Sequence, residues 1–288
     1  MIYYFILFLL LMLLFIFYCQ KRIVKYHKPK INNIEKFDKL TTIKPSIITY
    51  NIQKFPWSIK GFSNIKKLLE QYSIILLQEC YDDTFSLLHT NFPDYYIYRD
   101  PLEGVNILSS GLVILSLYPI TKYSSHNFKN YNPLTLDRLS QKGFIIANIN
   151  INGYDMCIIN THLQSSDHHK YDRYALLQLK EIIKYLEDIK QLFILGGDFN
   201  IDIVDLQSIF KNYFPSEWQF CYPKEPTIYF NLKSGYTQSH YKPGYEPFIF
   251  DYFITNIKNE IYVCDVKTIP NPYSDHNPVS CSLDFSNV

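Results

Sequence analysis

The chain has 288 residues, 47% of them hydrophobic, and a formal net charge of +1. This length and composition suit one domain with one large core. Residues 20–45 hold eight of the 28 basic residues and two of the 27 acidic ones, so the remainder has 20 basic and 25 acidic residues, a charge of −5. A mildly acidic domain argues against a broad basic face that grips nucleic acid backbones.

The first residues form an uncharged apolar run. Ile2 to Tyr18 carry no charged side chain, Cys19 extends the run, and Gln20-Lys21-Arg22 ends it. As a helix the run would span about 27 Å, close to the thickness of a bilayer core. It has neither the basic start nor the small-residue cleavage site of a signal peptide, so we expect a retained single-pass transmembrane helix over residues 1–20.

Basic residues follow this run directly, within a polar linker over residues 21–45. They are Lys21, Arg22, Lys25, Lys28 and Lys30, and only the terminal amine is charged before the run. The positive-inside rule therefore predicts that the folded domain, residues 46–288, is cytoplasmic. The same charges can hold the linker against anionic lipid.

Beyond the linker, short apolar and β-branched runs predict more strands than helices. We expect strands near 46–52, 73–79, 111–117, 144–151, 156–162, 192–198, 250–256, 260–266 and 279–284. An apolar stripe predicts a helix over 171–189, and a shorter helix is expected over 63–72. Many strands with few helices indicate an α/β fold in which helices flank two packed sheets.

The six cysteines are spread singly along the chain, several of them inside strand-like runs, and no CxxC pair occurs. We interpret them as reduced core residues. A Cys/His zinc site would need clustered ligand spacing, which the sequence lacks.

Polar residues follow four of the apolar runs at the points where strands should end. They include Asn51, Glu79, His162 and Asp198. Polar groups at strand ends can converge on one rim of a sheet, and carboxylate and amide oxygens are ligands that Mg²⁺ prefers. We therefore predict that Glu79 binds metal and that Asn51 assists it. Taken alone, a Glu at this position would be better explained as a solvent-exposed strand end; the other polar blocks favour the metal site.

The block Asp198-Phe199-Asn200 places two polar side chains at i and i+2. An extended backbone would put both on one face, where they could meet one phosphate and its attacking water. The alternative is an Asx turn after the strand, with Gly196-Gly197 as punctuation.

Two histidines suit the two tasks of phosphodiester hydrolysis, which needs a base for the nucleophile and donors for phosphoryl charge. His276 is the expected general base, with Asp251 orienting its ring and Asp275 beside it as a metal ligand. His162 is the expected donor. The remaining histidines, His89, His126, His168, His169 and His240, are expected in loops or on the surface.

In this order, the blocks resemble the endonuclease/exonuclease/phosphatase superfamily with its DNase I-like fold, and within it the neutral and bacterial sphingomyelinases. The resemblance covers residues 46–286. Further stretches that carry it are Ser110 to Ser116 with Tyr118-Pro119-Ile120, Asp137 to Gly143, Thr161 to Gln164 with Arg173 and Gln178 to Ile182, and Glu246 to Tyr252.

The resemblance implies a four-layer α/β/β/α sandwich and roles for individual residues. Metal binding falls to Glu79, Asn51 and Asp275, and the implied ion is Mg²⁺. Catalytic roles fall to His276, Asp251, His162, Asp198, Asn200 and Lys142; Lys142, in an Asp-x₄-Lys-Gly element, would reach the phosphate.

The leading hypothesis is a membrane-anchored, Mg²⁺-dependent phosphodiesterase that hydrolyses sphingomyelin to ceramide and phosphocholine. One alternative is another phosphoesterase of the superfamily, either a DNA endonuclease or an inositol-polyphosphate phosphatase. A second is a non-catalytic membrane-bound binding protein that kept the fold. The aromatic-rich stretch from Tyr213 to Tyr252 could contact lipid, or could simply contribute loop and core aromatics.

Overall fold

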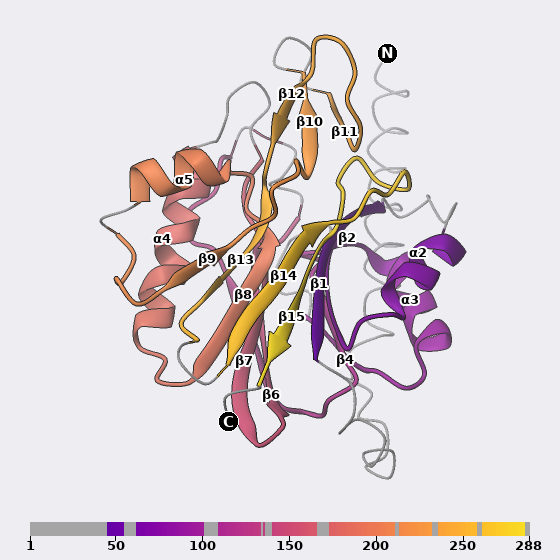
Figure 1. Cartoon of the computed structure of the whole chain (residues 1–288), viewed down its shortest axis with the longest axis vertical. Helices are drawn as coiled ribbons and strands as arrows, with labels where there is room; N and C mark the ends of the chain where they lie inside the picture. The colour runs from indigo at the N-terminus through magenta and orange to yellow at the C-terminus, as the bar shows by residue number, and fades with distance from the viewer. Residues whose placement is uncertain are drawn as a thin grey trace, which may run out of the picture.

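The computed structural model describes residues 45–54, 62–100, 109–133, 135, 140–165, 173–210, 213–231, 236–257 and 261–285. Two six-stranded sheets pack face to face, and a three-stranded sheet projects beyond one end of them (Figure 1). The expected transmembrane helix over 1–20 and the linker as far as residue 44 lie outside the described residues. None of the helices within the described ranges is long and apolar enough to cross a membrane.

The first sheet has the strand order β14-β15-β1-β2-β4-β3. Its strands are β1 (Ser46–Lys54), β2 (Ile74–Cys80), β3 (Tyr96–Arg99), β4 (Val113–Ser116), β14 (Tyr262–Thr268) and β15 (Val279–Asp284). Strand β1 runs parallel to β2 and antiparallel to β15. Its start is tied to the end of β15, where the Leu283 amide donates to the Pro45 carbonyl at 2.8 Å.

The second sheet has the order β5-β6-β7-β8-β13-β9. Its strands are β5 (Ile120–Asn127), β6 (Gly143–Ile151), β7 (Tyr154–His162), β8 (Leu192–Asp198), β9 (Gln219–Cys221) and β13 (Asp251–Thr255). Strands β7 and β8 are parallel, and β13 is antiparallel to β8. The projecting small sheet consists of β10 (Ile228–Phe230), β11 (Thr237–Gln238) and β12 (Glu246–Phe248).

Three apolar clusters fix the order of the layers. Ile47, Leu76 and other inward residues of the first sheet pack against Ile158 and Ile194 of the second. Helices α2 (Phe62–Leu69) and α3 (Asp82–Asn91) cover the outer face of the first sheet. Helices α4 (Arg173–Glu187) and α5 (Ile203–Phe210) cover the outer face of the second (Figure 1). The described residues therefore form a mixed α/β sandwich consistent with a DNase I-like fold.

Each of the nine expected strand runs coincides with a strand of the two large sheets, and both expected helices are present as α2 and α4. Elements that the sequence analysis did not expect are α3, α5, β3, β5 and β9 to β12. Strand β5 is mostly polar and partly exposed, and β9 to β12 have two or three residues each. Such short or polar segments carry no clear hydrophobic period.

Candidate active site

The structure brings the four polar strand ends together on one rim, as expected. Asn51 lies near the end of β1 and Glu79 near the end of β2, while His162 and Asp198 are the last residues of β7 and β8. Because β1 is parallel to β2 and β7 to β8, these ends meet at the same side of each sheet. Asp198 pairs with His162 on one side and with Asp251 on the other.

Asn51 joins the two large sheets across this rim. Its side-chain Nδ2 lies 3.1 Å from Oε1 of Glu79 and 3.0 Å from Oδ2 of Asp198. Its Oδ1 accepts the backbone amide of Gln53 at 3.0 Å. The buried amide thus places a carboxylate of the first sheet beside one of the second.

Glu79 is held in an unusual and costly environment. Its φ of +53° lies in the left-handed region, which costs a non-glycine residue on the order of 1 to 3 kcal/mol. Burial, followed by the charge of Asp275, raises its pKa to about 7; the Asn51 hydrogen bond and the charges of Lys142 and His276 oppose this rise. A carboxylate whose ionised form is disfavoured in this way would be stabilised by a bound cation.

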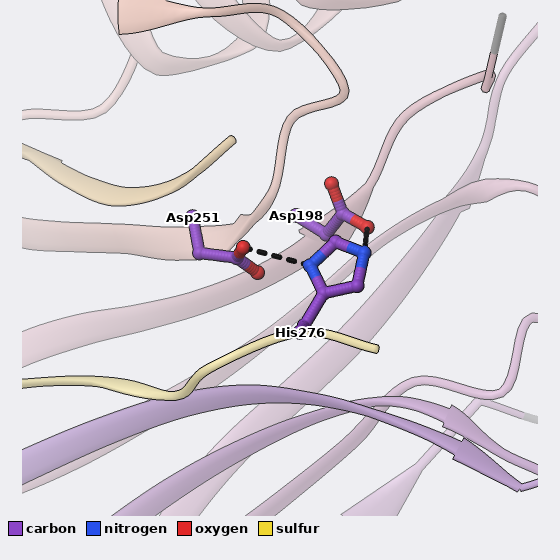
Figure 2. A group of neighbouring side chains, drawn as sticks. All are labelled: Asp198, Asp251 and His276. Carbon is purple, nitrogen blue, oxygen red and sulfur yellow. Dashed lines mark hydrogen bonds and ion pairs between the residues drawn. The ribbon is translucent and has the colours of Figure 1, made fainter. Parts of the chain in front are cut away.

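His276 lies between two buried carboxylates (Figure 2). Its Nδ1 is 2.8 Å from Oδ2 of Asp251, and its Nε2 is 3.6 Å from Oδ2 of Asp198. Burial alone lowers the pKa of the imidazole, but Asp251, Asp198 and Asp275 raise it well above its ordinary value. In the metal-free protein this ring therefore holds a proton, which must leave before the ring can act as a base, and a cation bound nearby would favour that loss.

His162 contacts the same Asp198 carboxylate, but its surroundings shift its pKa in the opposite direction. Its Nε2 lies 3.4 Å from Oδ2 of Asp198. Burial and the positive charge of Lys142 lower its pKa to about 3, although Asp198 opposes them. The ring is therefore neutral, so its contact with Asp198 is not an ion pair. A neutral imidazole can donate one N–H to a developing negative charge.

The prediction that an extended backbone puts Asp198 and Asn200 on one face is wrong. Asn200 has a φ of +49°, and its amide donates to Oδ1 of Asp198 at 3.0 Å, which is the Asx turn considered as the alternative. The turn still directs the Asn200 side chain inward, where Nδ2 donates to the Leu163 carbonyl at 3.0 Å. Nζ of Lys142 donates to the same carbonyl at 3.2 Å, so Lys142 and Asn200 lie side by side.

Asp275 is placed by contacts that the sequence analysis missed. One of its oxygens accepts a hydrogen bond from the Thr237 hydroxyl of β11, and the other lies 3.3 Å from the Ser274 hydroxyl. That hydroxyl donates to the Asn51 carbonyl at 2.7 Å. Ser274 belongs to the polar block around His276, so its place in the site could be expected from the sequence. Thr237 lies 38 residues away from Asp275, and no sequence pattern links it to the site.

The donor set fits a hard divalent cation. Glu79 and Asp198 each accept a hydrogen bond from Nδ2 of Asn51, and the charge of Asp275 contributes to the raised pKa of Glu79, so the negative charge here is poorly compensated. Asp198, Asp251 and His276 also offer atoms within 4.8 Å of one another that could hold a metal. We assign His276 and Asp251 to proton transfer, because Nδ1 of His276 is already engaged by Asp251 at 2.8 Å.

Replacing Asp251 with asparagine is expected to lower the pKa of His276, because the amide keeps the shape of the carboxylate but removes the charge that raises the pKa most. An NMR titration of the His276 ring in the metal-free protein would measure this. Asp202→Asn, which alters a carboxylate that accepts the Ile249 amide at 3.0 Å, serves as a control. An unchanged His276 titration in Asp251→Asn would contradict the pairing.

Comparison with known proteins finds relatives in sequence and solved structures with the same fold. Phospholipase C of Staphylococcus aureus is 24% identical over 255 residues, covering 73% of this chain and 76% of the relative. Sphingomyelinases C of other bacteria are also among the relatives and structural neighbours. Zebrafish TDP2 with a single-stranded DNA product superposes with a TM-score of 0.65 at 15% identity, covering 84% of this chain and 99% of TDP2.

The structure of a beta toxin variant from S. aureus, solved with bound magnesium ions, superposes with a TM-score of 0.62 at 20% identity. The superposition covers 83% of this chain and 99% of the toxin chain. At such identities the two solved structures establish the fold alone. The family model for the endonuclease/exonuclease/phosphatase family matches residues 48–276. This match spans β1 to the loop that carries His276, and the chain therefore belongs to the endonuclease/exonuclease/phosphatase family.

Proposed function

We propose that this protein is a Mg²⁺-dependent phosphodiesterase that hydrolyses sphingomyelin to ceramide and phosphocholine at a membrane. The observation that carries the hydrolase assignment is the His276–Asp251 pair at 2.8 Å beside the Glu79, Asp198 and Asp275 carboxylates. A base next to a cation-binding set is what hydrolysis of a phosphodiester by water requires. The lipid substrate is supported by the relatives named phospholipase C and sphingomyelinase C.

In this mechanism the deprotonated His276 removes a proton from water through Nε2, while Asp251 holds Nδ1 and stabilises the imidazolium that forms. The water oxygen bonds to phosphorus as the bond to the ceramide oxygen breaks. The ceramide oxygen takes up a proton from solvent, and His276 afterwards returns its proton to solvent. Asp198 and Asn200 position the water and the phosphate. The neutral His162 and the ammonium of Lys142 donate to phosphoryl oxygens.

Glu79, Asn51 and Asp275 would hold the Mg²⁺. When bound, the ion supplies Lewis-acid polarisation of a phosphoryl oxygen. The proposal also places the chain at a membrane through residues 1–20, with residues 46–288 on the cytoplasmic side, because a tether beside a lipid substrate raises its local concentration.

A second candidate activity is hydrolysis of a DNA phosphodiester. The structural likeness to TDP2 with its DNA product favours it. The charge of −5 on residues 46–288 weighs against it, because phosphate contacts from basic side chains dominate the affinity of nucleic-acid-binding proteins.

Assays on the full chain in mixed micelles separate these candidates. Sphingomyelin, phosphatidylcholine, plasmid DNA and single-stranded DNA would be incubated in parallel with Mg²⁺ or with EDTA. We expect phosphocholine release from sphingomyelin that requires Mg²⁺, with both DNA substrates intact. Cleaved DNA with untouched lipid would overturn the substrate, and equal turnover in EDTA would overturn the metal.

A further inference from the structure

The small sheet reaches both members of the His276–Asp251 pair. The pair joins two separate parts of the fold, since Asp251 begins β13 of the second sheet and His276 lies in the loop over residues 269–278, between β14 and β15 of the first. We call this segment the His276 loop. For the two side chains to form a hydrogen bond of 2.8 Å, other contacts must hold the His276 loop in place relative to the start of β13.

Thr227, immediately before β10, makes hydrogen bonds to both parts. Its hydroxyl Oγ1 accepts the backbone amides of Phe250 at 3.0 Å and Asp251 at 3.3 Å. Its carbonyl accepts the Asn277 amide at 2.7 Å. One residue thus holds the backbone of Asp251 and the backbone next to His276, and it is itself fully buried.

Asn277 extends this connection within the His276 loop. Its Nδ2 donates to the Ser239 carbonyl beside β11 at 2.7 Å, and its Oδ1 accepts the Asn271 amide at 2.9 Å. The side chain is 6% exposed, so losing either bond would leave a buried polar group without its partner. Thr237 of β11 donates to Asp275, so β11 and the residue that follows it contact both neighbours of His276.

We propose that Thr227 and Asn277 are positioning residues that set the geometry of the His276–Asp251 pair from the small sheet. Only the expected effect on kcat rests on the proposed function; the placement of the pair by these two residues does not. Neither residue reaches the reacting atoms, so their effect is on the orientation of the base. A base held out of line lowers kcat, while Asn51 on β1 and Glu79 on β2, which would hold the metal, stay in place.

The test compares two buried threonines, each with a hydroxyl that makes two hydrogen bonds. Thr255, at the other end of β13, is also 0% exposed; its hydroxyl donates to the Phe193 carbonyl at 2.6 Å and accepts the Ile257 amide at 3.1 Å. Thr227→Val and Thr255→Val each remove a buried hydroxyl with little change of shape. Thr227→Ser keeps the hydroxyl and serves as the rescue variant.

We expect Thr227→Val and Asn277→Ala in the full chain to lower kcat by about 10- to 100-fold with KM within about twofold of the wild type. Thr227→Ser should restore most of kcat. Thr255→Val should lower the melting temperature to a similar extent but leave kcat unchanged. Equal losses of kcat in the two valine variants, or none in Thr227→Val, would overturn the proposal.

A second measurement does not depend on turnover. The proton between Nδ1 of His276 and Asp251 should give a downfield NMR resonance that disappears in Asp251→Asn. We expect it to shift or broaden in Thr227→Val and Asn277→Ala and to stay in place in Thr255→Val. If the wild type hydrolyses no phosphodiester, the proposed function fails, while this resonance still decides whether Thr227 and Asn277 position the pair.

Discussion

Replacing His276 with alanine is expected to reduce kcat by about 10²- to 10⁴-fold while the protein stays folded, which is the range that a positioned general base contributes. His276 lies 2.8 Å from Asp251 and 3.6 Å from Asp198, and their charges raise its pKa. Steady-state phosphocholine release from sphingomyelin at saturating Mg²⁺ would measure the loss.

The matched control for this variant is His89→Ala. The His89 ring packs edge-on against Phe85 with centroids 5.0 Å apart, near the end of α3 on the outer face of the first sheet. Its removal should reduce stability through lost packing but leave kcat within about twofold, as a distant site should. A folded His276→Ala protein that retains near-normal turnover would show that another group activates the water.

Glu79→Gln is expected to abolish the stabilisation that Mg²⁺ gives the protein and to lower turnover by several orders of magnitude, because the charge that holds the cation is lost. The metal-free variant should nevertheless be more stable than the wild type at pH 8. At pH 8 the wild-type Glu79 carboxylate is ionised, although its burial disfavours the charged form and raises its pKa to about 7. The glutamine amide is neutral and avoids this cost. Thermal melts at pH 8, with and without Mg²⁺, measure both effects.

The same pKa sets the direction of the pH dependence. Glu79 ionises at about pH 7 in the metal-free protein, above its ordinary value, so below about pH 7 a proton must leave before a cation can bind. The apparent affinity for Mg²⁺ should therefore fall about tenfold for each pH unit below 7. Titration calorimetry between pH 5.5 and 8 would show this slope, and a flat profile would mean that Glu79 is not a ligand.

The parts of the site that could be predicted from the sequence are those where an apolar strand stops directly at a polar residue. Glu79 after Ile74 to Leu77 and Asp198 after Leu192 to Leu195 follow this rule, and the structure places both on the same rim. Hydrophobic period identifies the strand, and parallel pairing then brings the ends together. The α/β sandwich could be expected for the same reason.

The parts that could not be predicted depend on backbone conformation or on contacts between distant residues. The left-handed φ of Glu79 is not favoured by its residue type, so only the surrounding packing imposes it. Thr227 directly precedes a strand of three residues and Thr237 belongs to one of two, and such short segments have no measurable period. Their partners, Asn277 and Asp275, lie 50 and 38 residues away along the chain.

The pairing of Pro45 with Leu283 puts the start of the domain at the end of β1 that is remote from Asn51 and Glu79. Asn51 is the sixth residue of β1, a rise of about 20 Å from Pro45, so the chain enters the domain about that far from the site. The 25 residues from 21 to 45 can extend to about 85 Å at most. For a chain held at a bilayer by its first 20 residues, this length lets the domain turn over and face the bilayer that holds it. If the linker were cut to about eight residues, the domain could not turn over. The site would then face away from the bilayer that holds the chain, toward a second membrane on the opposite side.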